Sequence, residues 1–110
     1  MNGLNYQRSL VGQSSVQING ALCEDCQKHN EFMSTIGHLE HSNHEICSLR
    51  ENVGMKTFFG TVNWNCESKC FLDMWMNCQY HRDNLLASGS EIGLALYISG
   101  NRIYATYRIK

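Results

Sequence analysis

The sequence predicts an α+β domain in which helices pack against a small antiparallel sheet. Residues 91–99 and 102–110 alternate large apolar residues with others on either side of Gly100-Asn101, which is typical of a β-hairpin. Residues 20–36 repeat apolar side chains at steps of three and four, which is typical of an amphipathic helix. With 110 residues, the chain has the length of a single domain, residues 1–110.

The first half of the chain is expected to be mainly helical. Residues 4–12 form a predicted short helix, and a polar loop is expected over residues 13–20. The helix over residues 20–36 is expected to bury one stripe, made of Leu22, Cys26, His29, Met33 and Ile36. Gly37 is suited to end this helix, because glycine readily adopts the left-handed conformation found at helix C-termini.

The second half is expected to supply the sheet. A short strand is predicted over residues 47–53, and residues 55–63 are expected to form a loop or a ragged strand end. Asn65 is suited to cap a helix over residues 66–77. The predicted buried stripe of that helix comprises Cys66, Cys70, Phe71, Met74, Trp75 and Cys78. A short helix over residues 81–86 then leads into the hairpin.

Composition and charge exclude several classes of protein. The net charge is -1 with neutral histidines, so no basic surface for nucleic acid is expected. No apolar run approaches the roughly 18–20 residues of a transmembrane segment. No signal peptide is recognisable at the start of the sequence, which suits either a mature secreted chain or a cytoplasmic protein.

The six cysteines leave three interpretations open: disulfides, free thiols and a metal site. The candidates are Cys23, Cys26, Cys47, Cys66, Cys70 and Cys78. An even count in a small domain favours disulfides and an oxidising compartment. A bond within the predicted helix is geometrically difficult, so a helix cysteine paired with Cys47 is the better candidate. Buried free thiols would suit a cytoplasmic protein.

A series of motifs resembles the CAP superfamily, which groups cysteine-rich secretory proteins, antigen 5 and pathogenesis-related proteins. The motifs lie in residues 4–8, 26–33, 36–41, 50–53, 75–86 and 91–95, and they most resemble short bacterial-type members. The resemblance implies a CAP-type α-β-α sandwich, with a sheet made of the hairpin and a strand near residues 46–53. Three positions depart from the pattern: Arg50 replaces a glycine, and Cys78 and Tyr80 replace a serine and a glycine.

The resemblance also implies that His41, Glu51 and His81 converge in a central cleft, with Asn77 in the place of a second acidic residue. Two neutral imidazoles can hold a divalent cation, most readily Zn²⁺, while a carboxylate either binds it or orients a histidine. Without a metal, the same trio can exchange protons near neutral pH. The alternative is that both histidines are structural, and that Glu51 is exposed or paired with a neighbouring arginine, Arg50 or Arg82.

The other histidines and the large side chains of the predicted helix have simpler interpretations. His29 lies on a helix stripe and is expected to be structural, whereas His38 and His44 are expected at the surface. Met74 and Trp75 are expected in the core.

Two functions follow from the cleft. The favoured one is a secreted or extracytoplasmic, non-enzymatic CAP-type module that binds a cation or ligand and interacts with an unknown protein or lipid. The alternative is a hydrolase that uses metal-activated or histidine-activated water. Ser42, beside His41, is the nearby candidate for a nucleophile, but no motif provides it with a base.

Overall fold

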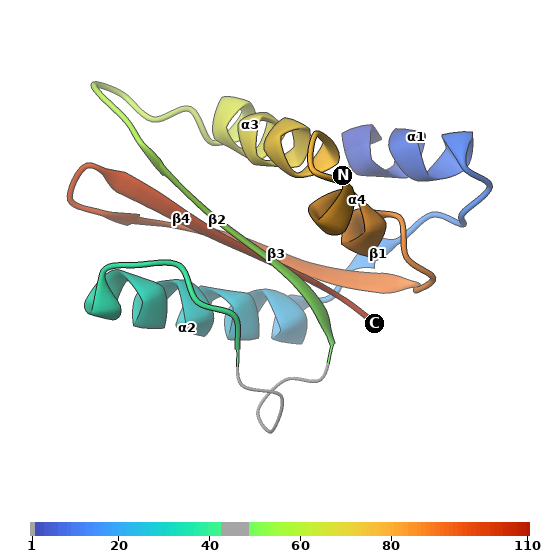
Figure 1. The fold of residues 1–110 in the computed structure, drawn as a ribbon, viewed down its shortest axis with the longest axis horizontal. Coiled ribbons are helices and arrows are strands. Elements are labelled where there is room, and N and C mark those ends of the chain that lie inside the picture. Colours follow the sequence, from blue (N-terminus) through green and yellow to red (C-terminus); the bar gives the residue numbers. More distant parts are fainter. Residues whose placement is uncertain (1, 43–48) are drawn as a thin grey trace.

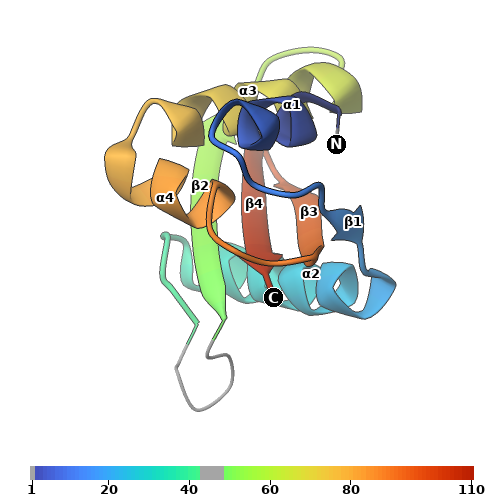
Figure 2. The same ribbon diagram turned by 90° about the vertical axis from the view of Figure 1, so that its right-hand side faces the viewer.

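The computed structural model describes residues 2–42 and 49–110. A central sheet separates two helical layers (Figures 1 and 2). One face carries α2 (Gly20–Ile36), and the other carries α1 (Asn2–Leu10), α3 (Trp64–Met76) and α4 (Gln79–Leu85). The predicted α+β sandwich with helices on both faces is therefore confirmed.

The sheet has the strand order β1-β3-β4-β2. Its centre is the predicted hairpin of β3 (Glu91–Ser99) and β4 (Arg102–Ile109), and β2 (Arg50–Thr57) pairs antiparallel with β4. The remaining strand, β1 (Gln17–Ile18), pairs parallel with β3 inside the segment expected to be a loop, so the sheet is mixed and not purely antiparallel. Two residues are too few to show an alternating pattern, which is why the sequence did not reveal β1.

Strand β2 continues further than expected. Residues 55–57, assigned to a loop or a ragged strand end, pair in register with residues 102–104 of β4. The neighbouring strand supplies hydrogen-bond partners that a local pattern does not contain. Residues 47 and 48, at the predicted start of this strand, lie outside the described residues.

Helix α2 has the predicted limits. Asn19 accepts a hydrogen bond from the Leu22 amide at its start, and Gly37 ends it at φ 78°, with its own amide donating to Met33. Among the predicted stripe, Leu22, Cys26, His29 and Met33 are buried, and Ile36 is half-buried. No helix in the described ranges is both long and apolar enough to cross a membrane.

Helix α3 differs from the prediction in both its start and its orientation. The Asn63 side chain, not that of Asn65, caps it by accepting from the amides of residues 65 and 66. Only Phe71 and Trp75 of the predicted stripe are buried, and the Trp75 indole N–H donates to the Val53 carbonyl at 3.2 Å. The other four members of that stripe are exposed: Cys66, Cys70, Met74 and Cys78. The pattern predicted the wrong orientation because Cys and Met count as apolar residues. The large rings of Phe71 and Trp75 determine which face of the helix packs against the sheet.

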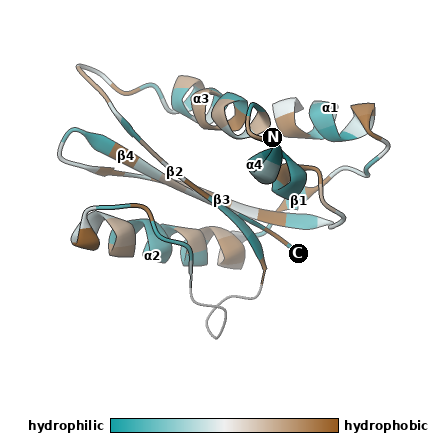
Figure 3. Ribbon diagram, viewed as in Figure 1, coloured by the Kyte–Doolittle hydropathy of each residue, from teal (hydrophilic) through white to brown (hydrophobic). Residues whose placement is uncertain are grey.

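Each face of the sheet has its own core. The larger core lies under α1, α3 and α4 and comprises Leu4, Val16, Phe71, Trp75, Leu85, Ile92, Ile103, Ala105, Tyr107 and Ile109. The smaller core lies under α2 and comprises Met33, Val53 and Tyr104. Helix α4 is mostly hydrophilic (Figure 3), and Leu85 is its member of the larger core. Its position therefore depends mainly on polar contacts.

Helix α1 is fastened by a fully buried arginine. The Arg8 guanidinium donates to the backbone carbonyls of Ser14, Leu85, Ala87 and Gly89 at 2.7–3.3 Å. Buried charge is costly unless its donors are satisfied, and these carbonyls satisfy them. Arg8 thus joins α1 to the segment that links α4 with β3.

Helix α2 approaches β3 so closely at Gly93 that no larger residue fits. A Cβ atom at Gly93 would lie 2.5 Å from the Leu22 carbonyl carbon, whereas one at Gly20 would meet nothing within 4 Å. We expect Gly93→Ala to lower the free energy of unfolding by about 1–3 kcal/mol or more. Gly20→Ala, the matched control, should change it by less than about 0.5 kcal/mol. Urea denaturation tests this, and equal stabilities of the two variants would contradict the close approach.

Candidate functional site

Glu51 is the centre of the candidate site. It lies on β2 directly opposite Arg108 on β4, and its carboxylate is buried. Oε1 accepts from the Ser42 amide at 2.8 Å and from His41 Nδ1 at 3.1 Å. Oε2 accepts from Ser42 Oγ at 2.7 Å and from Arg108 Nε at 2.8 Å. Because a carboxylate has about four acceptor positions, this one is fully occupied.

These contacts keep Glu51 ionised. Burial alone would raise its pKa, but the hydrogen bonds from Ser42 and Arg108, together with the charge of His29, lower the pKa below its usual value. The interpretation of Glu51 as exposed or paired with Arg50 or Arg82 is therefore wrong. Its partner, Arg108, is 57 residues further along the chain, so no local pattern indicated it.

The same carboxylate fixes the orientation of His41. An ionised carboxylate only accepts, so His41 carries its proton on Nδ1, and Nε2 keeps its lone pair in the neutral form. The His41 side chain is half-exposed. Such a carboxylate–imidazole pair is typical of histidines that bind metals or move protons.

His81 is held near His41 by a network of amides. Asn52 donates to the His81 backbone carbonyl at 2.9 Å, and Asn84 donates to Asn52 and to the Glu51 carbonyl. Burial and then the charge of His41 lower the pKa of His81, so its imidazole is neutral at pH 7. The site therefore presents two imidazoles at the edge of the sheet formed by β2.

Tyr80 and Asn77 complete the surroundings of this site. The Tyr80 ring lies edge-on to His41 and to His81, with ring centroids 6.5 and 5.6 Å apart. In the sequence, Tyr80 stood out only as a departure from a motif, and its place beside the histidines was missed. Asn77 is exposed at the end of α3, and in the described structure its side chain makes no hydrogen bond to His41, Glu51 or His81.

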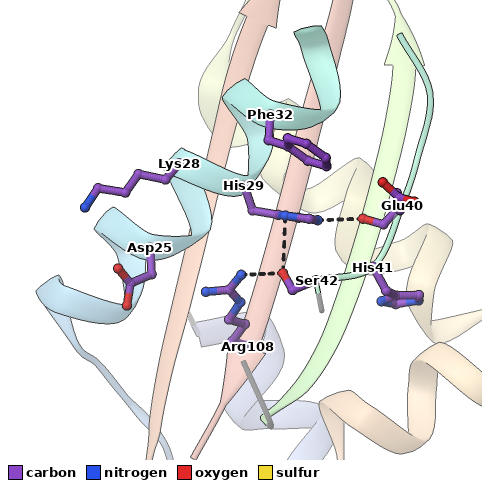
Figure 4. Close-up of a pocket in the computed structure, with 8 residues that line it drawn as sticks. All are labelled: Asp25, Lys28, His29, Phe32, Glu40, His41, Ser42 and Arg108. Atoms are coloured by element: carbon purple, nitrogen blue, oxygen red, sulfur yellow. Dashed lines mark hydrogen bonds between the residues drawn. The ribbon is translucent and has the colours of Figure 1, made fainter. Parts of the chain in front are cut away.

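A groove of about 720 Å³ adjoins the site on the α2 side (Figure 4). Its lining residues come from α2, from the segment after it and from β4: Asp25, Lys28, His29, Phe32, Glu40, His41, Ser42 and Arg108. His29 stacks on Phe32, with its ring nitrogens at the Glu40 carbonyl and Ser42 Oγ. These contacts agree with a structural role for His29.

The other candidate ligands are dispersed. His38 is exposed. His44 and Cys47 lie outside the described residues, and so does the predicted disulfide between Cys47 and a helix cysteine. No disulfide joins two of the described cysteines, and Cys23, Cys66, Cys70 and Cys78 are free thiols.

The donor set decides how a metal ion could fit. In the part of the chain that the structure describes, no group of three or more His, Cys, Asp or Glu side chains is arranged to hold one. Glu51 has no acceptor position left, while the imidazoles of His41 and His81 remain available. The two imidazoles are therefore the side chains of this site that could act as ligands, with Glu51 orienting the first of them.

Comparison with known proteins identifies the class. The model of the cysteine-rich secretory protein (CAP) family matches residues 1–108. The chain therefore belongs to the CAP family, as the motifs suggested. No curated protein sequence matches it.

Solved structures share the fold at low sequence identity. An outer surface protein from Borrelia burgdorferi is 12% identical with a TM-score of 0.70, and the match covers 99% of this chain and 87% of that one. A cysteine-rich secretory protein from Staphylococcus aureus is 19% identical with a TM-score of 0.60, over 99% and 37% of the chains. The hookworm platelet inhibitor is 16% identical with a TM-score of 0.65, over 99% and 63%. These similarities establish the fold.

The buried ion pair predicts a large effect of Arg108→Ala. The substitution leaves the Glu51 carboxylate buried without its cation, so we expect a loss of about 3–5 kcal/mol in the free energy of unfolding. Lys69→Ala, which removes an exposed pair with Asp73, is the control and should leave the stability almost unchanged. Thermal and urea denaturation measure both. A loss in Arg108→Ala no larger than in the control would show that the pair contributes little.

The lowered pKa of His81 predicts a dependence of stability on pH. The unfolded state takes up a proton on His81 near its usual pKa of about 6.5, before the folded state does. Stability from this group is therefore complete above that pH and is lost as pH falls through the folded pKa. His81→Gln should flatten the curve between about pH 7 and pH 5, and His38→Gln, an exposed control, should not. An unchanged slope in His81→Gln would show that His81 does not cause the dependence of stability on pH.

Proposed function

We propose that this domain is a secreted, non-enzymatic binding module that holds a divalent cation, preferably Zn²⁺, between His41 and His81. The observation that supports it best is the 3.1 Å contact from His41 Nδ1 to Glu51 Oε1, which leaves Nε2 available as a ligand. Histidines that bind metal commonly donate their other ring N–H to a carboxylate in this way. Glu51 would then orient His41 and would not itself bind the cation.

His81 supplies the second ligand in this proposal. Metal binding requires a neutral imidazole, and the lowered pKa of His81 favours that form at neutral pH. Two protein ligands leave coordination positions for water or for a group on a partner. The partner would be a protein or a lipid, and the exposed Tyr80 ring beside both histidines would contact it.

The contacts around Ser42 argue against a hydrolase that uses this residue as its nucleophile. Its hydroxyl lies 2.7 Å from a carboxylate that has no free acceptor position, and Arg108 donates to the same oxygen at 2.7 Å. His29 is farther from that oxygen, at 3.2 Å. A nucleophile must transfer its proton to a base, and Glu51 is a poor base because its acceptor positions are occupied and it is ion-paired.

Secretion is proposed because similar structures include a secretory protein and an outer surface protein by name.

Zinc titration with the two histidines replaced tests the cation site. At a free Zn²⁺ concentration of 100 times Kd, binding should stabilise the wild type by about 2.7 kcal/mol and raise its melting temperature. The double variant His41→Ala/His81→Ala should lose this shift, whereas His38→Ala should keep it. His38 is the matched control, because it is an exposed histidine only three residues from His41. Calorimetric titration should give one site per chain.

Two results would contradict the proposal. An equal zinc shift in the double variant would place any bound zinc elsewhere. Hydrolysis of a nitrophenyl ester or a casein substrate that disappears in folded His81→Ala would favour the hydrolase.

A further inference from the structure

The connection between β2 and α3, residues 58–63, carries the most exposed large apolar side chain in the described part of the chain. Phe59 is 90% exposed, and Trp64, the first residue of α3, is 46% exposed. Residues 57–66 contain no charged side chain. Two exposed aromatic rings on one uncharged segment form an apolar patch, whereas a single exposed apolar residue would be ordinary. The proposed cation site uses none of these residues.

The loop is anchored from beneath, so that its other large apolar side chains are already in use. Phe58 and Val62 pack against the larger core, and the Phe58 amide donates to the Asn101 carbonyl at the tip of the β3–β4 hairpin, at 2.9 Å. Phe59 and Trp64 are the two aromatic side chains that remain outside. Because the loop is already fixed, docking through these rings costs little additional ordering of the backbone.

The loop lies at one end of the long axis of the molecule, beside the hairpin tip, whereas α1 lies at the other end (Figure 1). A projecting end can enter a fluid lipid layer, which closes around side chains of any shape, whereas a folded protein must offer a matching pocket. Tryptophan is enriched at the boundary between membrane and water, because its ring is amphipathic. The patch therefore matches a membrane surface better than a protein partner.

Basic side chains stand on the elements that hold the loop: Lys56 on β2, Lys69 on α3 and Arg102 on β4. Both lysines form ion pairs with carboxylates of α3. Arg102 lies opposite the last residue of β2, where the loop begins, and its guanidinium donates to two neutral oxygens, the Gly37 carbonyl and the Tyr104 hydroxyl. These contacts do not neutralise its positive charge, which suits the phosphate groups of lipids.

We propose that residues 58–64 form a membrane-docking tip, which inserts the Phe59 and Trp64 rings among the head groups of a phospholipid bilayer while Arg102 contacts lipid phosphate. Apolar burial supplies most of the affinity, because a single cation adds only a modest electrostatic contribution, so the protein also binds bilayers without net charge. Docking is reversible, since two rings bury far less apolar surface than a transmembrane helix does.

The tip and the candidate cation site can act at the same time. Glu51 and the loop lie at opposite ends of β2. Thr57 follows Glu51 by six positions, and a strand rises about 3.3 Å per residue, so the two residues are roughly 20 Å apart. A molecule docked by its tip therefore keeps the site around Glu51 clear of the bilayer.

Sedimentation with phosphatidylcholine vesicles, alone or with a minor fraction of phosphatidylserine, tests the proposal. The wild type should bind both compositions and should keep its binding to phosphatidylcholine in high salt. Phe59→Ala/Trp64→Ala should bind on the order of tenfold more weakly or worse. Arg102→Gln should weaken binding to the anionic vesicles by roughly fivefold. The matched control, Tyr6→Ala/Leu10→Ala, removes two side chains that are each 62% exposed on α1, at the opposite end, and should bind as the wild type does.

Tryptophan fluorescence locates the contact on the protein. Trp75 is only 2% exposed and lies in the larger core, so a blue shift on adding vesicles reports on Trp64. Lipids with brominated acyl chains should quench the same signal. Phe59→Ala alone keeps this probe and should shift only at higher lipid concentrations than the wild type.

The proposal would be overturned if the wild type bound neither composition, or if folded Phe59→Ala/Trp64→Ala bound as the wild type does. Binding that requires phosphatidylserine and disappears in high salt would also overturn it, because that result indicates electrostatic adsorption. So would self-association without lipid, measured by sedimentation equilibrium, that only this double variant loses. His41→Ala/His81→Ala should bind vesicles as the wild type does, which separates the tip from the cation site.

Discussion

The geometry of the candidate site depends on the buried ion pair between Glu51 and Arg108. Burying two charges is expensive, and it is tolerated here because hydrogen bonds from Ser42 and His41 occupy the rest of the carboxylate. The strand register places Glu51 opposite Arg108. Hydrogen bonds to its carboxylate then hold the segment after α2 against the edge of the sheet. One side chain therefore joins β2, β4 and that segment, and determines which nitrogen of His41 is free.

The second histidine is positioned mainly by amides, because Leu85 is the member of α4 that packs in the larger core. Asn52 and Asn84 link α4 to β2, and Arg50 donates to the Asn84 side chain at 3.2 Å. Arg50 stands where the family motif has a glycine, so this departure adds a contact to the network that holds His81. A hydrophilic helix is thereby fixed over an edge strand that would otherwise present unpaired backbone groups.

Local patterns were sufficient for the hairpin and for α2, because each contains its own turn or cap and a long regular repeat. They failed for β1, which is too short to show a period, and for the orientation of α3, where Cys and Met resembled core residues. The family motifs identified the positions of His41, Glu51 and His81. They did not reveal Arg108 or Tyr80, because strand register and the packing of α4 bring these residues to the site. Contacts distant in sequence leave little trace in a single sequence.

The buried Arg8 has a consequence for how the protein is made. Three of its four acceptors lie 77–81 residues later in the chain. Strand β1 and helix α2 likewise contact the hairpin of β3 and β4, which lies at the end of the chain. At roughly 5–20 residues per second, a ribosome needs several seconds or more to deliver those partners. During that time the nascent chain exposes the Arg8 guanidinium, which lacks its hydrogen-bond acceptors, and the apolar side of α2. Arg8, β1 and α2 can therefore complete these contacts only after the segment from Leu85 to the hairpin has been synthesised.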